Sequence, residues 1–172
     1  PVGRTRLLAA KLVAVMAFVL LALLVVAATA YVLGLVLLGH VTNGATATTF
    51  SGTELTGGQL AVRTALALLY ALLSMLGVAS VALFLSTVVR SPLAATMGTL
   101  ALLIGSSVLL TLDAASVLRP YLVTRYWLSF VDLFRDPILW HDVTRGVILQ
   151  AGYVVVFLGA AWANFVTKDI TY

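Results

Sequence analysis

Residues 64–89 read TALALLYALLSMLGVASVALFLSTVV and contain no charged side chain. After the short break Arg90-Ser91-Pro92, the chain is again uncharged up to Leu112. An α-helix needs about 20 apolar residues to cross roughly 30 Å of hydrocarbon, and each run is long enough. Ser91 and Pro92 are typical of a helix N-cap and first helical position. The pattern therefore predicts two antiparallel membrane spans joined by a very short turn.

Two further uncharged runs flank this pair, at residues 12–39 and 146–167. The whole chain is 62% hydrophobic and only 9% charged, so in water it would expose large apolar patches. We expect an all-α fold, a polytopic membrane helical bundle that forms a single transmembrane domain over residues 1–172. The expected spans are residues 8–38, 59–89, 92–112 and 147–166.

The segment before the last span, residues 119–140, mixes charged and aromatic residues. A helix drawn through Tyr121–Asp136 has an aromatic face and a polar face, which is typical of a helix at the membrane interface. The aromatic stripe holds Val123, Tyr126, Phe130 and Phe134, widened by Trp127, and the other side holds Arg125, Ser129, Asp132 and Asp136.

Two interpretations of this amphipathic segment remain open. It is an aromatic belt with solvated charges, or an interfacial or re-entrant helix that acts as an outer gate. The candidate gate residues are Arg125, Tyr126, Trp127, Phe130 and Asp132. Asp132 and Arg135 are spaced to form an i,i+3 ion pair.

The distribution of charge excludes several classes of function. Lys11 and Arg63 lie at span ends and no span carries a charge at mid-depth, which argues against an ion-coupled carrier. The phosphate-binding pattern GxxxxGK[ST] is missing, so we expect ATP hydrolysis only in a separate subunit. The net charge is +4 without a Lys/Arg run, so we expect no nucleic-acid partner.

No catalytic, cofactor or metal site is expected in this chain. Cysteine is absent, which removes thiol catalysis and thiolate ligands. His40 and His141 lie near predicted span edges and have no second histidine nearby, so we interpret them as ordinary interfacial residues. The chain itself is therefore not expected to be an enzyme.

Glycines recur along the predicted spans at positions where helices in lipid approach closely. We interpret them as helix-packing positions, with a subunit interface or a translocation pathway as the alternative. These candidates are Gly77, Gly98, Gly105, Gly152 and Gly159.

Four spans place both termini on one side of the membrane. Five basic residues then fall on each side, so the positive-inside rule does not decide the orientation. The first basic flank, with Arg4, Arg6 and Lys11, usually dominates and favours termini in the cytoplasm.

Three segments of the chain match short motifs of one known family. Residues 1–12, PVGRTRLLAAKL, resemble the P-x-x-R-x-x-(hydrophobic)-x-x-x-K start of the second span in the permease subunits of bacterial ABC exporters of the type-2 class. Residues 82–94, ALFLSTVVRSPLA, are similar to its turn between the third and fourth spans. Residues 164–171, NFVTKDIT, are similar to its C-terminal F-x-x-(R/K)-D-I.

The resemblance implies a subunit that lacks the first span and coupling helix of a six-span permease, in a cytoplasmic membrane with both termini cytoplasmic. It implies pairing with a second permease copy or homologue and with an ATP-binding-cassette ATPase that holds ATP and Mg. Arg4, Arg6 and Arg90 would lie on the coupling side, and residues 119–140 in the place of the family's re-entrant helices.

We therefore expect a permease that exports a hydrophobic or amphipathic compound, as in multidrug, antibiotic or lipid export. Such a permease is in contact with the surrounding membrane lipid. The apolar spans with scattered hydroxyl groups suit such a cargo. The alternative is a non-transporting membrane scaffold that anchors a partner enzyme. An intramembrane enzyme or a haem subunit is a third interpretation.

Overall fold

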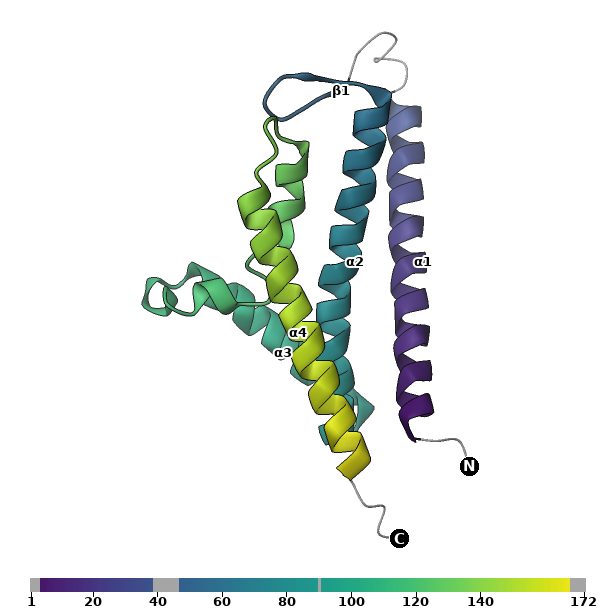
Figure 1. Ribbon diagram of the computed structural model, residues 1–172, viewed down its shortest axis with the longest axis vertical. Helices are drawn as coiled ribbons and strands as arrows, with labels where there is room; N and C mark the ends of the chain where they lie inside the picture. Colours follow the sequence, from purple (N-terminus) through teal and green to yellow (C-terminus); the bar gives the residue numbers. More distant parts are fainter. Residues whose placement is uncertain (1–3, 39–46, 90, 168–172) are drawn as a thin grey trace.

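The computed structural model describes residues 4–38, 47–89 and 91–167 as an all-α membrane helical bundle (Figure 1). Its helices are α1 (Arg4–Leu38), α2 (Gly57–Val88), α3 (Pro92–Thr111) and α4 (Trp140–Thr167). All four are long and apolar enough to cross a membrane, which confirms the predicted fold class. The start of α1 and the end of α4 lie at one end of the bundle.

The opposite end carries a small antiparallel hairpin of β1 (Ala47–Thr48) and β2 (Glu54–Leu55) (Figure 1). Gly52 has φ +83° in its turn, a backbone conformation that side chains with a Cβ rarely adopt. The hairpin leads directly into α2, whose first turn is closed by a capping box. Thr56 accepts from the Gln59 amide at 3.3 Å, while the Gln59 side chain accepts from the Thr56 amide at 3.1 Å.

The helix bounds differ from the predicted spans mainly at α4. This helix begins at Trp140, about two turns before the predicted Val147. Its first turns are amphipathic and carry His141, Asp142 and Arg145, so an apolar-run criterion missed them. The predicted N-cap and N1 positions of α3, Ser91 and Pro92, are confirmed, although the Ser91 hydroxyl makes no capping bond.

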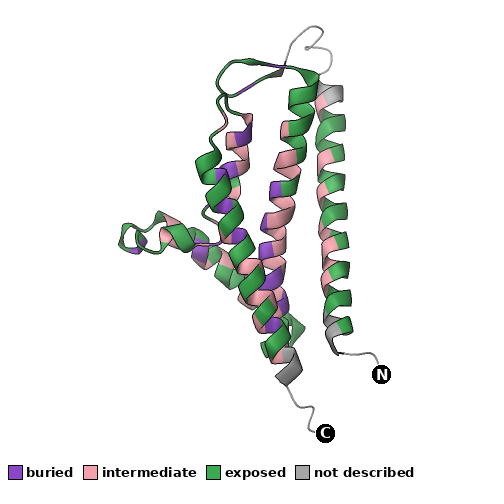
Figure 2. Cartoon of the chain, in the orientation of Figure 1, coloured by how far each residue is buried: buried purple, intermediate pink, exposed green. Residues whose placement is uncertain are grey.

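The core lies along one face of α2, against α4 and the segment that precedes α4 (Figure 2). The buried residues of α2 recur every three or four positions, as one helix face requires. They are Tyr70, Ser74, Gly77, Ser80, Val81 and Leu83. Among the α1 side chains that the structure describes, none is buried. One face of α1 is half-buried against α2 and α4, and the rest of its surface is exposed.

The segment between α3 and α4 is not the continuous amphipathic α-helix that the sequence predicts. It consists of three 3-10 helices, η1 (Asp113–Ala115), η2 (Arg119–Tyr121) and η3 (Trp127–Phe134), joined by turns. The part with η1 and η2 projects sideways from the bundle (Figure 1). The predicted faces change accordingly. Val123, Tyr126 and Ser129 are buried, although only Ser129 lies within η3, and Val123 and Tyr126 belong to the turn before it.

Candidate functional site

The most unusual feature of this bundle is residues 121–135, here called the pinned segment, which is non-α-helical backbone packed against spanning helices. In lipid every backbone polar group needs a partner, so irregular backbone is tolerated only where protein or water supplies one. Turn bonds such as Ser129 N to Tyr126 O, at 3.0 Å, satisfy some of its groups. Side chains of the surrounding helices satisfy others.

Three long polar side chains of α2 and α4 donate to carbonyl oxygens of the pinned segment. The Tyr153 hydroxyl donates to Tyr121 O at 2.8 Å, and Gln150 Nε2 donates to Val123 O at 2.9 Å. The Tyr70 hydroxyl donates to Tyr126 O at 2.6 Å. Tyr70 lies about 20 Å along α2 from Gly57, so these bonds reach well inside the spans.

Ser106 of α3, and Arg63 near the hairpin end of α2, also bind the pinned segment. Ser106 Oγ accepts from the Thr124 amide at 3.3 Å and lies 2.8 Å from the Thr124 hydroxyl oxygen. Arg63 Nη1 donates to Leu133 O at 3.2 Å and to Arg135 O at 2.9 Å. The pinned segment is therefore tied to α2, α3 and α4 at once, and mostly through its backbone.

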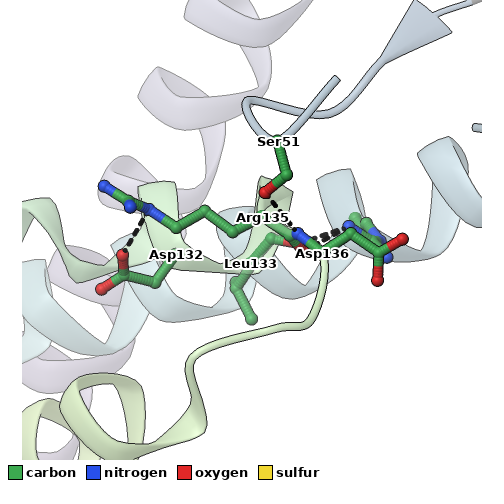
Figure 3. A network of polar contacts seen from close by, with 6 residues as sticks. Ser51, Asp132, Leu133, Arg135 and Asp136 are labelled. Atoms are coloured by element: carbon green, nitrogen blue, oxygen red, sulfur yellow. Dashed lines mark hydrogen bonds and ion pairs between the residues drawn. The ribbon is translucent and has the colours of Figure 1, made fainter. Parts of the chain in front are cut away.

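The hairpin closes over the far end of the pinned segment (Figure 3). Phe50 N donates to Phe134 O at 3.1 Å, and Asp136 N donates to the Ser51 hydroxyl at 3.0 Å. Asp132 and Arg135 form the predicted i,i+3 ion pair at 3.1 Å. The Asp132 side chain is 16% exposed, so the pair is partly shielded from solvent.

Two glycines make room for the side chains that pin the segment. A Cβ on Gly77 would meet Gln150 Oε1, and its Cδ at 3.3 Å. A Cβ on Gly146 would meet the Tyr70 hydroxyl, with Tyr126 Cβ at 2.9 Å and Tyr70 Cζ at 3.0 Å. Because these two glycines have no side chain, Gln150 Nε2 can reach Val123 O and the Tyr70 hydroxyl can reach Tyr126 O.

The other predicted packing glycines behave differently. Gly98 has one neighbour, Leu85 Cδ1 at 3.3 Å from a built Cβ, which is the flexible end of a side chain. Gly105, Gly152 and Gly159 have nothing within 4 Å. Packing within the chain therefore does not explain these three. Gly105 and Gly152 instead line open apolar grooves on the bundle surface.

Gln150 is the most completely buried long polar side chain of the described residues, at 1% exposure. Its Nε2 donates to Val123 O, but its Oε1 is buried and has no hydrogen-bond partner among the described residues. The indole Nε1 of Trp127 is likewise buried and has no hydrogen-bond partner among the described residues. Each unpaired buried polar atom costs free energy, so both mark places where the packed arrangement is not at its most stable.

The predicted gate residues are divided between the surface and the interior. Tyr126 is 7% exposed, whereas Arg125 is exposed and its guanidinium lies 5.8 Å from the centre of the Tyr126 ring. Trp127, Phe130 and Asp132 are half-buried. All five thus lie within the pinned segment, but they do not form one face.

The predicted coupling residues Arg4 and Arg6 begin α1, and Arg6 is exposed. Arg90 lies outside the described residues, as does His40. His141 is exposed in the first turn of α4. Within residues 4–38, 47–89 and 91–167, no three His, Asp or Glu side chains gather as a metal site would require.

Gln150, Tyr70 and Arg63 were not predicted as site residues. Gln150 offered the clearest signal, since the uncharged run 146–167 holds only two amides, and the other, Asn164, lies near the end of the run. A buried polar side chain in a span is expensive and usually has a dedicated partner. Only the tertiary structure identifies that partner as a backbone carbonyl.

Comparison of the chain with family models, with curated proteins and with solved structures gave no match. The bundle and its pinned segment are therefore the features from which a function can be inferred.

Proposed function

We propose that this chain is the membrane-spanning permease subunit of an ATP-driven ABC exporter in the cell membrane, with both termini cytoplasmic. The second permease copy or homologue and the ATPase are separate chains, and the ATPase binds ATP and Mg. The cargo is a hydrophobic or amphipathic compound that enters from the bilayer.

The observation that carries the proposal is the pinned segment. A simple anchor needs only regular helices, which satisfy their own backbone in lipid. Here an irregular segment is instead held against the bundle by hydrogen bonds from α2, α3 and α4. Single hydrogen bonds of this kind contribute about 0.6–2 kcal/mol each, so they can be exchanged during a conformational cycle. This arrangement suits a gate.

Copurification tests the class of protein. The full chain, tagged and extracted from its native membrane in mild detergent, is expected to elute with an ATPase whose activity is stimulated by cargo. Charge reversal at Arg4 and Arg6 is expected to lower that stimulation several-fold while the complex still assembles. Elution without any nucleotide-hydrolysing subunit would instead support the scaffold.

Substitution within the pinned segment tests the gate. We expect Trp127→Ala and Phe130→Ala to reduce export in reconstituted vesicles by about tenfold, because each removes half-buried aromatic surface from the moving part. Leu128→Ala is the matched control, since Leu128 is 75% exposed in the same 3-10 helix. Equal export by the Trp127→Ala, Phe130→Ala and Leu128→Ala variants would contradict the proposal that the pinned segment is a gate.

A further inference from the structure

Residues 112–120, here called the arm, project sideways from the bundle at about its mid-height (Figure 1). The arm contains η1 and the first part of η2. Every residue of the arm except Ala115 and Arg119 is exposed, and Val117 reaches 80%. Among the described elements, only α3 packs extensively against η1. The outer side of the arm is therefore uncovered in the single chain.

The residue that follows the arm shows how deep in the membrane the arm lies. The Tyr121 carbonyl oxygen accepts from the Tyr153 hydroxyl at 2.8 Å. Tyr153 is near the middle of α4 (Trp140–Thr167), about 20 Å from each end of that helix. The hydrocarbon core of a bilayer is roughly 30 Å thick, so the arm is at the level of the lipid chains and not of the headgroups.

The arm carries two charged side chains at this depth. Arg119 Nη2 contacts Asp113 Oδ1 at 2.9 Å, but the Asp113 side chain is fully exposed and that of Arg119 is 30% exposed. Charged side chains within a membrane almost always face protein or a water-filled cavity, because hydrocarbon does not solvate them. Non-α-helical backbone at this depth is under the same restriction. Protein, and not a lipid chain, is therefore the cover that the arm requires.

The charges of the arm also indicate which protein covers it. One arm holds one carboxylate and one guanidinium, so its charge pattern is complementary to itself. When a two-fold axis relates two copies, the same patch meets itself, and Asp113 of each copy can lie against Arg119 of the other. The exposed side chains of Val117 and Leu118 would then be buried between the two arms. We propose that the arm is the surface through which two copies of this chain form a dimer in the membrane.

This dimer contact deepens the proposed function, because it assigns the surface that holds the second permease copy, and it rests on that function only for the role of the dimer. The two proposals fail separately. A chain that copurifies with an ATPase but shows no contact through the arm contradicts the dimer contact alone. A dimer through the arm without an ATPase contradicts the exporter alone.

Cysteine crosslinking in native membranes tests the contact, because the full chain has no cysteine of its own. Leu112→Cys, Val117→Cys and Leu118→Cys each place one thiol on the arm. Leu21→Cys, at a position 63% exposed in the middle of α1, is the matched control. With copper phenanthroline, an oxidant that enters the bilayer, we expect at least one arm variant to give about fivefold more disulfide-linked dimer than the control. Yields no higher than the control, or a crosslinked product that contains a different protein, would overturn the proposal.

Charge reversal separates a contact between copies from the ion pair within one copy. Asp113→Arg leaves two positive charges on the arm and Arg119→Asp leaves two negative charges, and each breaks the internal pair. In the arm variant that crosslinks best, we expect either reversal alone to lower the yield of dimer about fivefold, because like charges then meet across the axis.

Co-production of the two reversed chains, each with a different tag, is expected to restore crosslinking as mixed dimers. The internal pair stays broken in both chains, so only pairing between copies explains such a recovery. A chain that merely failed to fold would not be rescued in this way. Mixed dimers no more abundant than the dimers of either reversed chain alone would overturn the proposal.

Discussion

Gly77 is the residue on which the fit between α2 and α4 depends most directly. A methyl group there would occupy the position of Gln150 Oε1, and Gln150 in turn holds Val123 O. We expect Gly77→Ala to destabilise the bundle by about 1–3 kcal/mol, because the Gln150 side chain must shift and its bond to the pinned segment is lost. Thermal unfolding in detergent, followed by tryptophan fluorescence, measures this.

Gly159→Ala is the control for helix propensity at this scale. Its surroundings are open, so the substitution should leave stability unchanged or raise it by up to about 1 kcal/mol. Equal destabilisation by the two substitutions would mean that the contact between Gly77 and Gln150 does not limit packing.

At the level of the element, Arg63 joins α2 to the far end of the pinned segment through two carbonyl oxygens. We expect Arg63→Met to speed amide hydrogen exchange at Phe50 and Asp136 by about fivefold. Phe134, whose carbonyl accepts from the Phe50 amide, lies between the two residues that the arginine holds, and Asp136 follows them directly. Mass spectrometry of peptides from each region reports the change. Arg145→Met, an exposed arginine of α4, is the control. Equal exchange in both variants would contradict this role.

The four spanning helices could be predicted because length and apolar composition decide them locally. The break at Arg90-Ser91-Pro92 also follows from local chemistry. The pinned segment could not be predicted in the same way. A 3-10 helix and an α-helix differ by little in local energy, and tertiary bonds to Val123 O and Tyr126 O stabilise this backbone. Those donors come from residues far along the chain, so no sequence window contains both partners.

At the scale of the whole molecule, the two ends of the bundle differ in what they expose. One end carries the hairpin and the Asp132–Arg135 pair, and the other carries the first turn of α1 and the start of α3. The Asn164 side chain donates to the Thr87 hydroxyl at 3.0 Å, which shows that the ends of α2 and α4 lie together. Ser91 follows the end of α2 and therefore lies at this second end. The bundle therefore requires Glu54 and Ser91 on opposite sides of the membrane.

Because the chain has no cysteine, single substitutions can test this arrangement without background labelling. Glu54→Cys and Ser91→Cys are both at exposed positions outside the apolar runs. With cytoplasmic termini, a membrane-impermeant maleimide applied to intact cells is expected to label Glu54→Cys, and to label Ser91→Cys only after permeabilisation. The reverse pattern would keep the bundle but invert it, and would place the hairpin rather than α1 on the side of the proposed ATPase subunit. Labelling of both positions in intact cells would contradict the four-span arrangement, since the single span α2 lies between Glu54 and Ser91 and must place them on opposite sides of the membrane.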